Sequence, residues 1–435
     1  MKFFVRILLL TLVLLWLSSC RQEDELPQPP IVNFSSPQTN QFFEYGDTLF
    51  VRANISFASA GYAVKVSLLD ENQVAVVAPV IINSVSEIYE LNTWLVFDNP
   101  EAASGKYQIQ LKVIYGEYSW NEWVDVQLIE LEKRFLSLII VTQPSPGNYS
   151  VYQDDLNNPP VLLFRYTGDF SDAAVQHVHN RLIIAGKEKT GILVWDLIRN
   201  ESAWTIETVP GAPAQWLYGF YSSEAMKQIF FSGRDGLILG YDAFGRSTFR
   251  SEKVDNGVFT EILASGNGVL SAFEPFGGQP GELVRFSHPA GIITGRLNVQ
   301  GKIHRFFLSG NTSGFIAEDE GKFSFYTANN SLADFSMLKI RELPVNALAG
   351  FTSDNSGNLF LGSENSIYWY RTSNNSFVPF TDYPGVQHLA FDNVNSLLFA
   401  SGQNKIRYFG FPDFFISEER VYPEEVVAVM VRYNK

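Results

Sequence analysis

The sequence holds a single cysteine, Cys20, among its 435 residues, so no disulfide can form within one chain. Apolar contacts must therefore hold the fold together. A chain of this length buries enough surface in its core to need neither a disulfide framework nor a structural metal. The length itself indicates two or three domains.

Positive charge is also scarce. Lys and Arg number 32 against 46 Asp and Glu, which gives a net charge of −14 at neutral pH. A protein that binds a phosphate backbone needs a positive surface, so this balance argues against nucleic acid as a partner. Long stretches with apolar residues at helical spacing are missing as well, which argues against an α/β enzyme fold.

Aromatic and turn-forming residues are abundant instead. The sequence has 36 Phe, 19 Tyr and 8 Trp, together with 32 Gly and 20 Pro. Aromatic residues favour strands, and Gly and Pro favour the turns between strands. We therefore predict an all-β protein.

The first 20 residues have the pattern of an export signal. Lys2 and Arg6 precede the run Ile7–Leu17, which is apolar except for Thr11, and no acidic residue occurs before Glu23. This run is shorter than the about 20 residues that cross a bilayer comfortably. A basic start followed by a short apolar run is typical of a secretory signal.

The segment Leu17-Ser18-Ser19-Cys20 resembles the lipobox of bacterial lipoproteins, in which cleavage precedes the cysteine and the cysteine is lipidated. The resemblance implies that residues 1–19 are removed and that Cys20 carries acyl chains. Two or more such chains hold a protein stably on a bilayer. A cysteine used in this way excludes thiol catalysis. The alternative is an uncleaved signal anchor with an incidental cysteine.

Residues 20–30 are acidic and rich in proline, and we expect them to form an extended tether. The acidic cluster Glu23-Asp24-Glu25 resembles the surface-export signal of lipoproteins in the Bacteroidetes, although a solvated spacer has the same composition. The resemblance implies a lipid anchor in the outer membrane, with the rest of the chain facing the periplasm or the cell surface.

Residues 31–132 show strand patterns at close spacing. Apolar and polar side chains alternate strictly along Lys106–Val113, which predicts a half-buried antiparallel strand. The expected strands are Asp47–Ser56, Tyr62–Leu69, Gln73–Ile82, Ser86–Phe97, Lys106–Tyr115 and Glu122–Leu131. A segment of about 100 residues with roughly seven strands is typical of an immunoglobulin-like β-sandwich. It resembles the spacer modules of surface lipoproteins, and we expect it to hold the rest of the chain away from the membrane.

Residues 135–435 contain a repeated unit, in which a short apolar strand ends in a small residue and is followed by a turn and an aromatic-rich strand. The small residues lie at positions 185, 232, 272, 317, 362 and 400, at intervals of 47, 40, 45, 45 and 38 residues. A period of about 40 to 45 residues in short strands is typical of β-propeller blades. The 301 residues of the segment, divided by the mean interval of 43, give seven blades.

Six copies of the unit are complete, and the two ends of the segment can supply the seventh. Glu425–Tyr433 would be the innermost strand, and Phe135–Thr142, Tyr149–Asp154 and Val161–Tyr166 would complete the blade. Pairing both ends in one blade removes the open edge of the sheet. We therefore predict a seven-bladed β-propeller closed by both ends of the segment.

This segment resembles the WD40/YVTN type of propeller. The Trp-Asp dipeptide of that family occurs at Trp195-Asp196, with Tyr241-Asp242 as a looser analogue, while the Gly-His half of the signature is absent. Motifs of enzymatic propellers are also absent, namely the Ser-x-Asp-x-Gly-x-Thr-Trp box of sialidases and the Gly and Trp repeats of quinone-dependent dehydrogenases. No Gly-x-Ser-x-Gly nucleophile elbow occurs. We expect a protein that is not an enzyme, with no catalytic residue and no cofactor.

Aligning the repeats predicts which side chains line the central channel. Four apolar residues begin the innermost strands in this alignment: Val175, Ile303, Val345 and Val386. Polar residues follow them, and His177 and His179 alternate on one expected strand, so both would face the same side. The candidate channel-lining residues for ligand binding are Gln176, His177, His179, His304, Arg305, Asn346, Gln387 and His388.

Three or four neutral imidazoles at a channel mouth can hold a transition metal, as in the seven-bladed oligogalacturonate lyases, whose motifs are not evident here. We expect instead a polar lining that is hydrogen-bonded to water and backbone, and no metal. A group of aromatic residues offers another kind of site: Trp204, Trp216, Tyr218, Phe220, Tyr221, Trp369 and Tyr370. Exposed rings in a cleft favour recognition of sugars or peptides, but we expect most of these rings to fill the space between blades.

These observations lead to one expectation and two alternatives. We expect non-catalytic recognition of a protein partner in the cell envelope or at the cell surface, because propeller loops make a broad polar face. One alternative is a glycan-binding lipoprotein of a polysaccharide-uptake system. The other is a metal-assisted polysaccharide lyase or hydrolase at the channel mouth.

Overall fold

The computed structural model describes residues 28–57, 62–208, 211–212, 216–266, 268–309, 312–330, 334–354, 356–413 and 415–435. The expected signal, Cys20 and most of the expected tether lie outside these residues. The described residues form strands and turns without a helix, so the prediction of an all-β fold is confirmed. It follows that none of them belongs to a helix long and apolar enough to span a membrane. The chain divides into two compact units, Met1–Glu132 and Lys133–Lys435.

The first unit contains two sheets that share one core. The three-stranded sheet has the order β1 (Ile31–Ser36), β3 (Thr48–Ser56) and β6 (Ile88–Val96). The five-stranded sheet has the order β2 (Gln41–Glu44), β8 (Tyr118–Ile129), β7 (Gly105–Tyr115), β4 (Tyr62–Leu69) and β5 (Val80–Val85). Val51 and Leu91 of the first sheet and Val66 and Leu111 of the second are buried in the same cluster. The alternation along Lys106–Val113 is therefore the alternation of one face in the core and one in water.

One strand of this unit begins later than the sequence predicts. The expected strand Gln73–Ile82 is replaced by β5, which starts at Val80. The carboxylate of Asp70 accepts hydrogen bonds from the backbone N–H groups of Asn72 and Val74, and Gln73 has a φ of 63°. A side-chain turn of this kind competes with the sheet for the backbone. It holds this part of the chain in a turn before β5.

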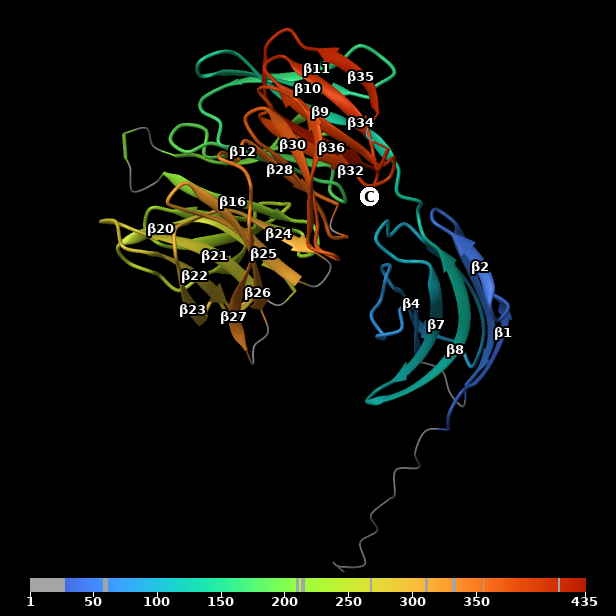
Figure 1. Ribbon diagram of the computed structural model, residues 1–435. Helices are drawn as coiled ribbons and strands as arrows, with labels where there is room; N and C mark the ends of the chain where they lie inside the picture. Colours follow the sequence, from blue (N-terminus) through green and yellow to red (C-terminus); the bar gives the residue numbers. More distant parts are fainter. Residues whose placement is uncertain are drawn as a thin grey trace, which may run out of the picture. The chain divides into compact units, whose positions relative to one another are not determined.

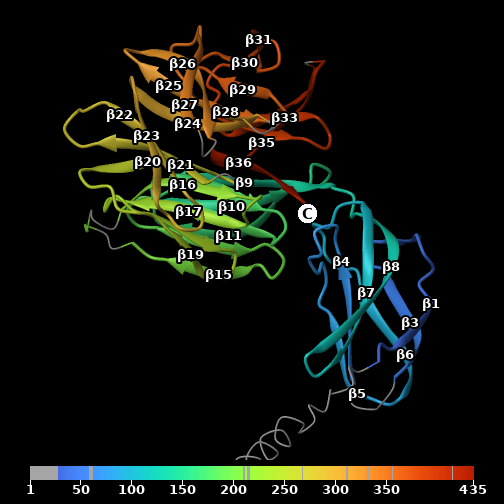
Figure 2. The same cartoon turned by 90° about the horizontal axis from the view of Figure 1, so that it is seen from below.

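The described part of the second unit forms seven four-stranded antiparallel sheets, which we number as blades 1 to 7 (Figures 1 and 2). Blade 1 comprises β12 (Asp172–Gln176), β13 (Arg181–Ala185), β14 (Ile192–Asp196) and β15 (Glu201–Ile206). Blade 2 comprises β16 (Leu217–Ser223), β17 (Gln228–Gly233), β18 (Ile238–Asp242) and β19 (Ser247–Arg250). Blade 3 comprises β20 (Gly257–Ser265), β21 (Gly268–Pro275), β22 (Gly281–Phe286) and β23 (Ile293–Val299).

The next three blades follow in the same way along the chain. Blade 4 comprises β24 (Lys302–Ser309), β25 (Thr312–Asp319), β26 (Lys322–Asn330) and β27 (Phe335–Glu342). Blade 5 comprises β28 (Gly350–Ser353), β29 (Asn358–Gly362), β30 (Ser366–Arg371) and β31 (Ser376–Asp382). Blade 6 comprises β32 (His388–Asp392), β33 (Leu397–Gly402), β34 (Lys405–Gly410) and β35 (Ile416–Val421).

Blade 7 joins the two ends of the unit, and this closure is confirmed. Its order is β11 (Val161–Thr167), β10 (Asn148–Asp154), β9 (Phe135–Ser145) and β36 (Glu425–Tyr433). In the antiparallel pair of β36 and β9, Val429 lies opposite Ile140 and Val431 opposite Leu138. Figure 1 shows β36 beside β9 and β10 in the part of the ring where the chain ends.

Seven clusters of buried apolar side chains lie at the seams between successive blades, one for each seam. At the seam between blades 5 and 6, for example, Phe360 stacks on Phe391 with ring centroids 5.1 Å apart. The repeated apolar triplet supplies these clusters, since Leu182, Ile183 and Ile184 are all fully buried. A blade cannot bury both faces alone, so the repeat is stable only as a closed ring.

Candidate binding site in the central channel

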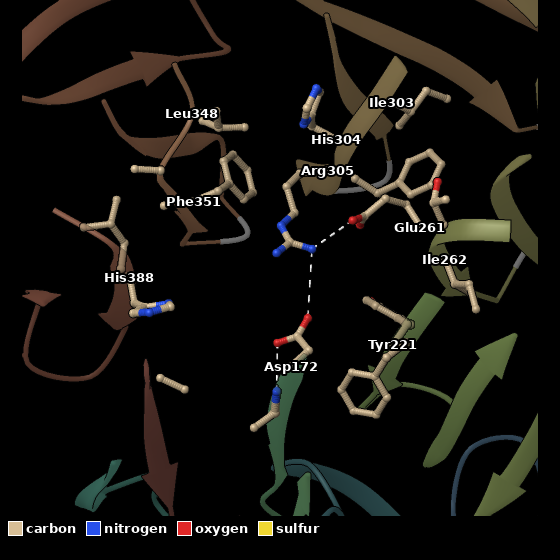
Figure 3. Close-up of a pocket in the computed structure, with 18 of the residues that line it drawn as sticks. Asp172, Tyr221, Glu261, Ile262, Ile303, His304, Arg305, Leu348, Phe351 and His388 are labelled. Atoms are coloured by element: carbon tan, nitrogen blue, oxygen red, sulfur yellow. Dashed lines mark hydrogen bonds and ion pairs between the residues drawn. The ribbon is translucent and has the colours of Figure 1, made fainter. Parts of the chain in front are cut away.

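The innermost strands of the seven blades surround a cavity of about 670 Å³ (Figure 3). Each blade contributes at least one side chain to its wall, among them Asp172, Tyr221, Glu261, Arg305, Phe351, His388 and Val429. Charged, imidazole and aromatic groups from distant parts of the sequence therefore converge on one space. A cavity of this kind is the default candidate for ligand binding in a propeller.

An ion cluster of three side chains lies in the cavity. Arg305 Nη1 of β24 donates a hydrogen bond of 2.9 Å to Glu261 Oε1 of β20, and lies 3.9 Å from Asp172 Oδ2 of β12. Figure 3 shows the guanidinium between the two carboxylates, with His388 across the open space. Side-chain exposures of 47% for Arg305 and 41% for Asp172 place this cluster in contact with channel water.

The two carboxyl groups of this cluster are harder to ionise than usual. Burial, reinforced by the charge of Asp172, raises the pKa of Glu261 to about 7, although Arg305 acts in the opposite direction. Burial also raises the pKa of Asp172, again against the attraction of Arg305. Because channel water reaches Asp172, that rise is moderated by solvent. The single guanidinium of Arg305 is therefore the cation nearest to both carboxyl groups.

Two other polar side chains of the wall, those of His304 and Gln387, have hydrogen-bond partners within the protein. His304 Nε2 lies 2.6 Å from Glu318 Oε2. Gln387 Nε2 donates to Glu425 Oε1 at 3.3 Å, and Gln387 Oε1 accepts from the backbone N–H of Gln403 at 3.2 Å. These bonds fix the side chains at the mouth of the channel.

Aromatic rings contribute to the apolar part of the wall, together with aliphatic side chains such as Ile262 and Leu389. Tyr218, Phe220 and Tyr221 of β16 and Phe351 of β28 line the cavity. Lys187 Nζ lies 4.9 Å from the centroid of the Tyr218 ring. Three of the aromatic residues that the sequence suggests for recognition therefore reach the cavity, whereas Trp369 and Tyr370 are buried at the seams, as expected for most propeller rings.

The structure brings four of the eight candidate channel residues together in this wall: His304, Arg305, Gln387 and His388. Asn346 is exposed in the segment between β27 and β28 and is not part of the cavity wall. Burial and the charge of Arg305 lower the pKa of His388 to about 4, so this imidazole is neutral at physiological pH. Whether these residues bind a ligand stays a prediction.

The expectation that His177 and His179 lie on a channel-lining strand is wrong. β12 ends at Gln176, and residues 177–180 form the turn that leads into β13. His177 Nδ1 accepts a hydrogen bond from the backbone N–H of Tyr433, and the ring of His179 packs edge-on against Phe244. The reason is a misaligned register, because Val175 is the last residue but one of β12 whereas Ile303 is the second residue of β24.

Gln176 is also misplaced by that alignment. Its side chain is 1% exposed and is not part of the cavity wall. Neither its amide oxygen nor its amide nitrogen has a hydrogen-bond partner among the described residues. A buried amide of this kind is commonly satisfied by an internal water.

Sequence analysis missed Asp172 and Glu261, the two carboxylates of the cluster. Glu261 stands out in hindsight because it is the one charged residue in the otherwise apolar and small Gly257–Ser265 strand. An acidic side chain in an innermost strand is costly to bury without a partner. Asp172 is the first residue of β12. If blade 1 is aligned three residues earlier, Asp172 rather than Val175 corresponds to Ile303, which lines the cavity.

The alternative of a metal-assisted enzyme relied on imidazoles at one channel mouth. His388 begins β32 and lines the cavity, whereas His177 follows the last residue of β12 and contacts the end of β36. The two imidazoles therefore belong to opposite ends of the innermost strands. Among the described residues, no three His, Cys, Asp or Glu side chains are grouped closely enough to hold a metal ion.

His177 should make the propeller less stable in acid. Burial, with Lys133 and Arg432 nearby, lowers the pKa of His177 to about 4 from its ordinary 6.5. As the pH falls from 6.5 to 4, His177 becomes protonated in the unfolded chain but stays neutral in the folded chain. The free energy of unfolding therefore decreases over this range. We expect His177→Gln to lose less unfolding free energy over this range in pH-dependent denaturant titrations. Parallel curves for both proteins would contradict this assignment.

No protein-family model and no curated protein matches the chain. Among solved structures, a functionally unknown protein from Desulfotomaculum acetoxidans is similar with a TM-score of 0.51 and 11% identity, over 68% of this chain and 98% of that one. The WD40 repeats of RRP9 are similar with a TM-score of 0.50 and 10% identity, over 67% of this chain and 88% of that one.

A quinonprotein alcohol dehydrogenase-like protein from Bacteroides thetaiotaomicron is similar over 93% of this chain and 99% of its own, with 13% identity and a TM-score of 0.49. Identities this low bear on the fold alone. Together with the seven four-stranded sheets, the similarity to the RRP9 structure supports a β-propeller fold.

Proposed function

We propose that this protein is a membrane-anchored lipoprotein of the bacterial cell envelope whose propeller is a non-catalytic scaffold that recognises a protein partner. The proposal places the anchor at Cys20 in the outer membrane. The first unit would be an immunoglobulin-like spacer, and the propeller would face the periplasm or the cell surface.

The pairing of polar groups in the central channel carries this proposal. Arg305 binds Glu261, His304 binds Glu318, and Gln387 binds Glu425 and the backbone of Gln403. A general acid or base must reach a reacting group, whereas these three side chains are hydrogen-bonded to groups of the protein itself. Such a wall is suited to recognising charge and shape rather than to moving a proton.

The lipid anchor has its own test. We expect Cys20→Ser to abolish incorporation of radiolabelled palmitate, because the thiol is the acyl acceptor. Ser19→Ala, which alters the neighbouring residue and keeps the thiol, should still incorporate palmitate. Palmitate labelling that survives Cys20→Ser would remove the anchor from the proposal.

The recognition function is tested by affinity capture of the full-length, lipidated chain after cross-linking in its native envelope. We expect one envelope protein to be recovered in a fixed stoichiometry. Tagging that protein should then recover this chain in return. Recovery of no such protein, or turnover of a polysaccharide panel by the purified chain, would overturn the proposal.

A further inference from the structure

Acidic side chains outnumber basic ones around the channel cavity when the neighbours of its lining residues are counted with them. Two carboxylates line it, those of Asp172 and Glu261. Three others contact lining side chains: Glu274 lies 3.7 Å from Lys302, Glu318 binds His304, and Glu425 binds Gln387. The cationic side chains of the wall and its contacts are Lys187, Lys302 and Arg305. Five carboxyl groups therefore stand against three cationic side chains around the cavity, and Glu261 is only partly ionised at neutral pH because its pKa is raised to about 7 by burial.

The charge imbalance is sharpest where the cavity is open. Asp172 Oδ1 accepts from the backbone N–H of Ala173 at 2.8 Å, but Asp172 Oδ2 meets Arg305 only at 3.9 Å, beyond hydrogen-bond distance. The guanidinium itself is committed to Glu261 at 2.9 Å. A carboxylate oxygen in a protein cavity without a donor is a favourable place for a positive ligand group.

The rest of the wall also suits a cation. The rings of Phe220, Tyr221 and Phe351 line the same space, and the faces of aromatic rings attract positive charge. An anion would meet these ring faces and the two carboxylates, and it would have to compete with Glu261 for Arg305. The wall therefore discriminates by sign as well as by shape.

We propose that the channel cavity binds one cationic group on an alkyl chain, an ammonium or a guanidinium, beside Asp172 Oδ2 and among the aromatic rings, with Glu261 of the same ion cluster nearby. The inference rests on the proposed recognition function, because it identifies this group as a basic side chain of the protein partner. A free amine offers the same chemistry, so the experiment must separate the two sources. Negative potential focused in a channel would also steer such a side chain to its site.

The experiment measures binding to the full chain by isothermal titration calorimetry. The probes are Nα-acetyl-lysine amide and Nα-acetyl-arginine amide, with Nα-acetyl-norleucine amide as the uncharged control and putrescine as the free amine. We expect at least one blocked basic amino acid to bind and norleucine amide not to bind. Equal binding of norleucine amide, or no binding of either blocked basic amino acid, would overturn the inference. Binding of putrescine alone would overturn the assignment to a protein side chain.

Two neutralising variants give the matched comparison. Asp172→Asn should weaken binding of the cationic probe at least tenfold. Asp255→Asn removes the same charge from a residue that is 70% exposed, pairs with Lys253 and does not line the cavity, and it should change the affinity less than twofold. If Asp172→Asn fails to fold, as judged by circular dichroism, Glu261→Gln replaces it with the same expected loss. Unchanged affinity in the folded variant would contradict the inference.

The pH dependence provides a second readout. Binding should tighten from pH 6 to pH 8 as Glu261 ionises, and Glu261→Gln should remove this dependence. Glu261 is faced by Asp172 of β12, Tyr221 of β16, Lys302 and Arg305 of β24 and, across the cavity, His388 of β32. His304 is the remaining imidazole of the wall, so the series is repeated with His304→Gln, which should retain the dependence. A dependence that disappears only with His304→Gln would contradict the role of Glu261.

The outcome is separable from that of the proposed function. If the captured envelope protein binds Asp172→Asn as well as it binds the parent chain, the cation site is wrong and the recognition function survives. If the probes bind as expected and no envelope protein is recovered, the protein-recognition function is wrong and the cavity remains a cation site.

Discussion

Deleting residues 425–435 should leave the propeller unable to fold cooperatively. Val426, Val429, Val431 and Tyr433 of β36 are buried in the seam between blades 6 and 7. Burying side chains of this size contributes about 1.5 to 3 kcal/mol each, or about 6 to 12 kcal/mol together. A typical domain is stable by only about 5 to 15 kcal/mol. We expect the far-ultraviolet circular dichroism melt to lose the cooperative transition of the propeller and to keep only that of the first unit, which has its own core.

Two controls separate this effect from mere shortening. A chain that stops at Tyr433 keeps all of β36 and should melt within a few degrees of the parent. A synthetic peptide of residues 423–435, added during refolding, should restore the cooperative transition of the propeller because it supplies the missing strand. A deleted chain whose propeller still melts cooperatively near the parent temperature would show that β36 does not close the ring.

Asp154→Ala should cause the second largest loss. Asp154 is fully buried on β10 and accepts hydrogen bonds from Arg420 Nη1 at 2.6 Å and from the Tyr422 hydroxyl at 2.7 Å. Removing the carboxylate leaves a mostly buried guanidinium and a buried hydroxyl without their hydrogen-bond acceptor at the seam between blades 6 and 7. Breaking a buried ion pair in this way costs about 3 to 5 kcal/mol. We expect the Tm of the propeller to fall by roughly 5 to 15 °C.

Glu282→Ala is the matched control for this prediction. It breaks a pair with Arg296, with 3.2 Å between Nη1 and Oε2, in which both side chains are partly exposed. Exposed pairs contribute about 0.2 to 1 kcal/mol, so the Tm should fall by only a few degrees. Equal losses of Tm for Asp154→Ala and Glu282→Ala would mean that the ion pair between Asp154 of β10 and Arg420 of β35 adds little to the stability of the closed ring.

The propeller could be predicted from the sequence because its repeat encodes burial directly. Each apolar triplet with its small residue, such as Leu182–Ala185, is the second strand of a blade and lies in a seam. Closure followed from the need to pair β9, and only Glu425–Tyr433 remained to do so. The register of the innermost strands could not be predicted, because their two faces meet different surroundings and their sequences share no common pattern of apolar residues.

The candidate site was only partly predictable for the same reason. Ile303 and Val175 look equivalent in sequence, yet one lies at the start of its strand and the other at the end. Because of this offset, His304 and Arg305 line the cavity, whereas His177 follows the last residue of β12, at the other end of the innermost strands. Asp172 and Glu261 were missed because their role depends on Arg305 from another blade, a pairing that a single sequence does not reveal.

The pairing of β9 with β36 has a consequence for synthesis. Ile140 and Val429 lie opposite each other although they are 289 positions apart in the chain. At about 5 to 20 residues per second, translation takes about 15 to 60 seconds to bridge that distance. Throughout this time one edge of the apolar strand Phe135–Ser145 has no partner strand, because β36 has not yet been synthesised. The nascent chain therefore exposes an unpaired apolar strand edge until β36 has been made.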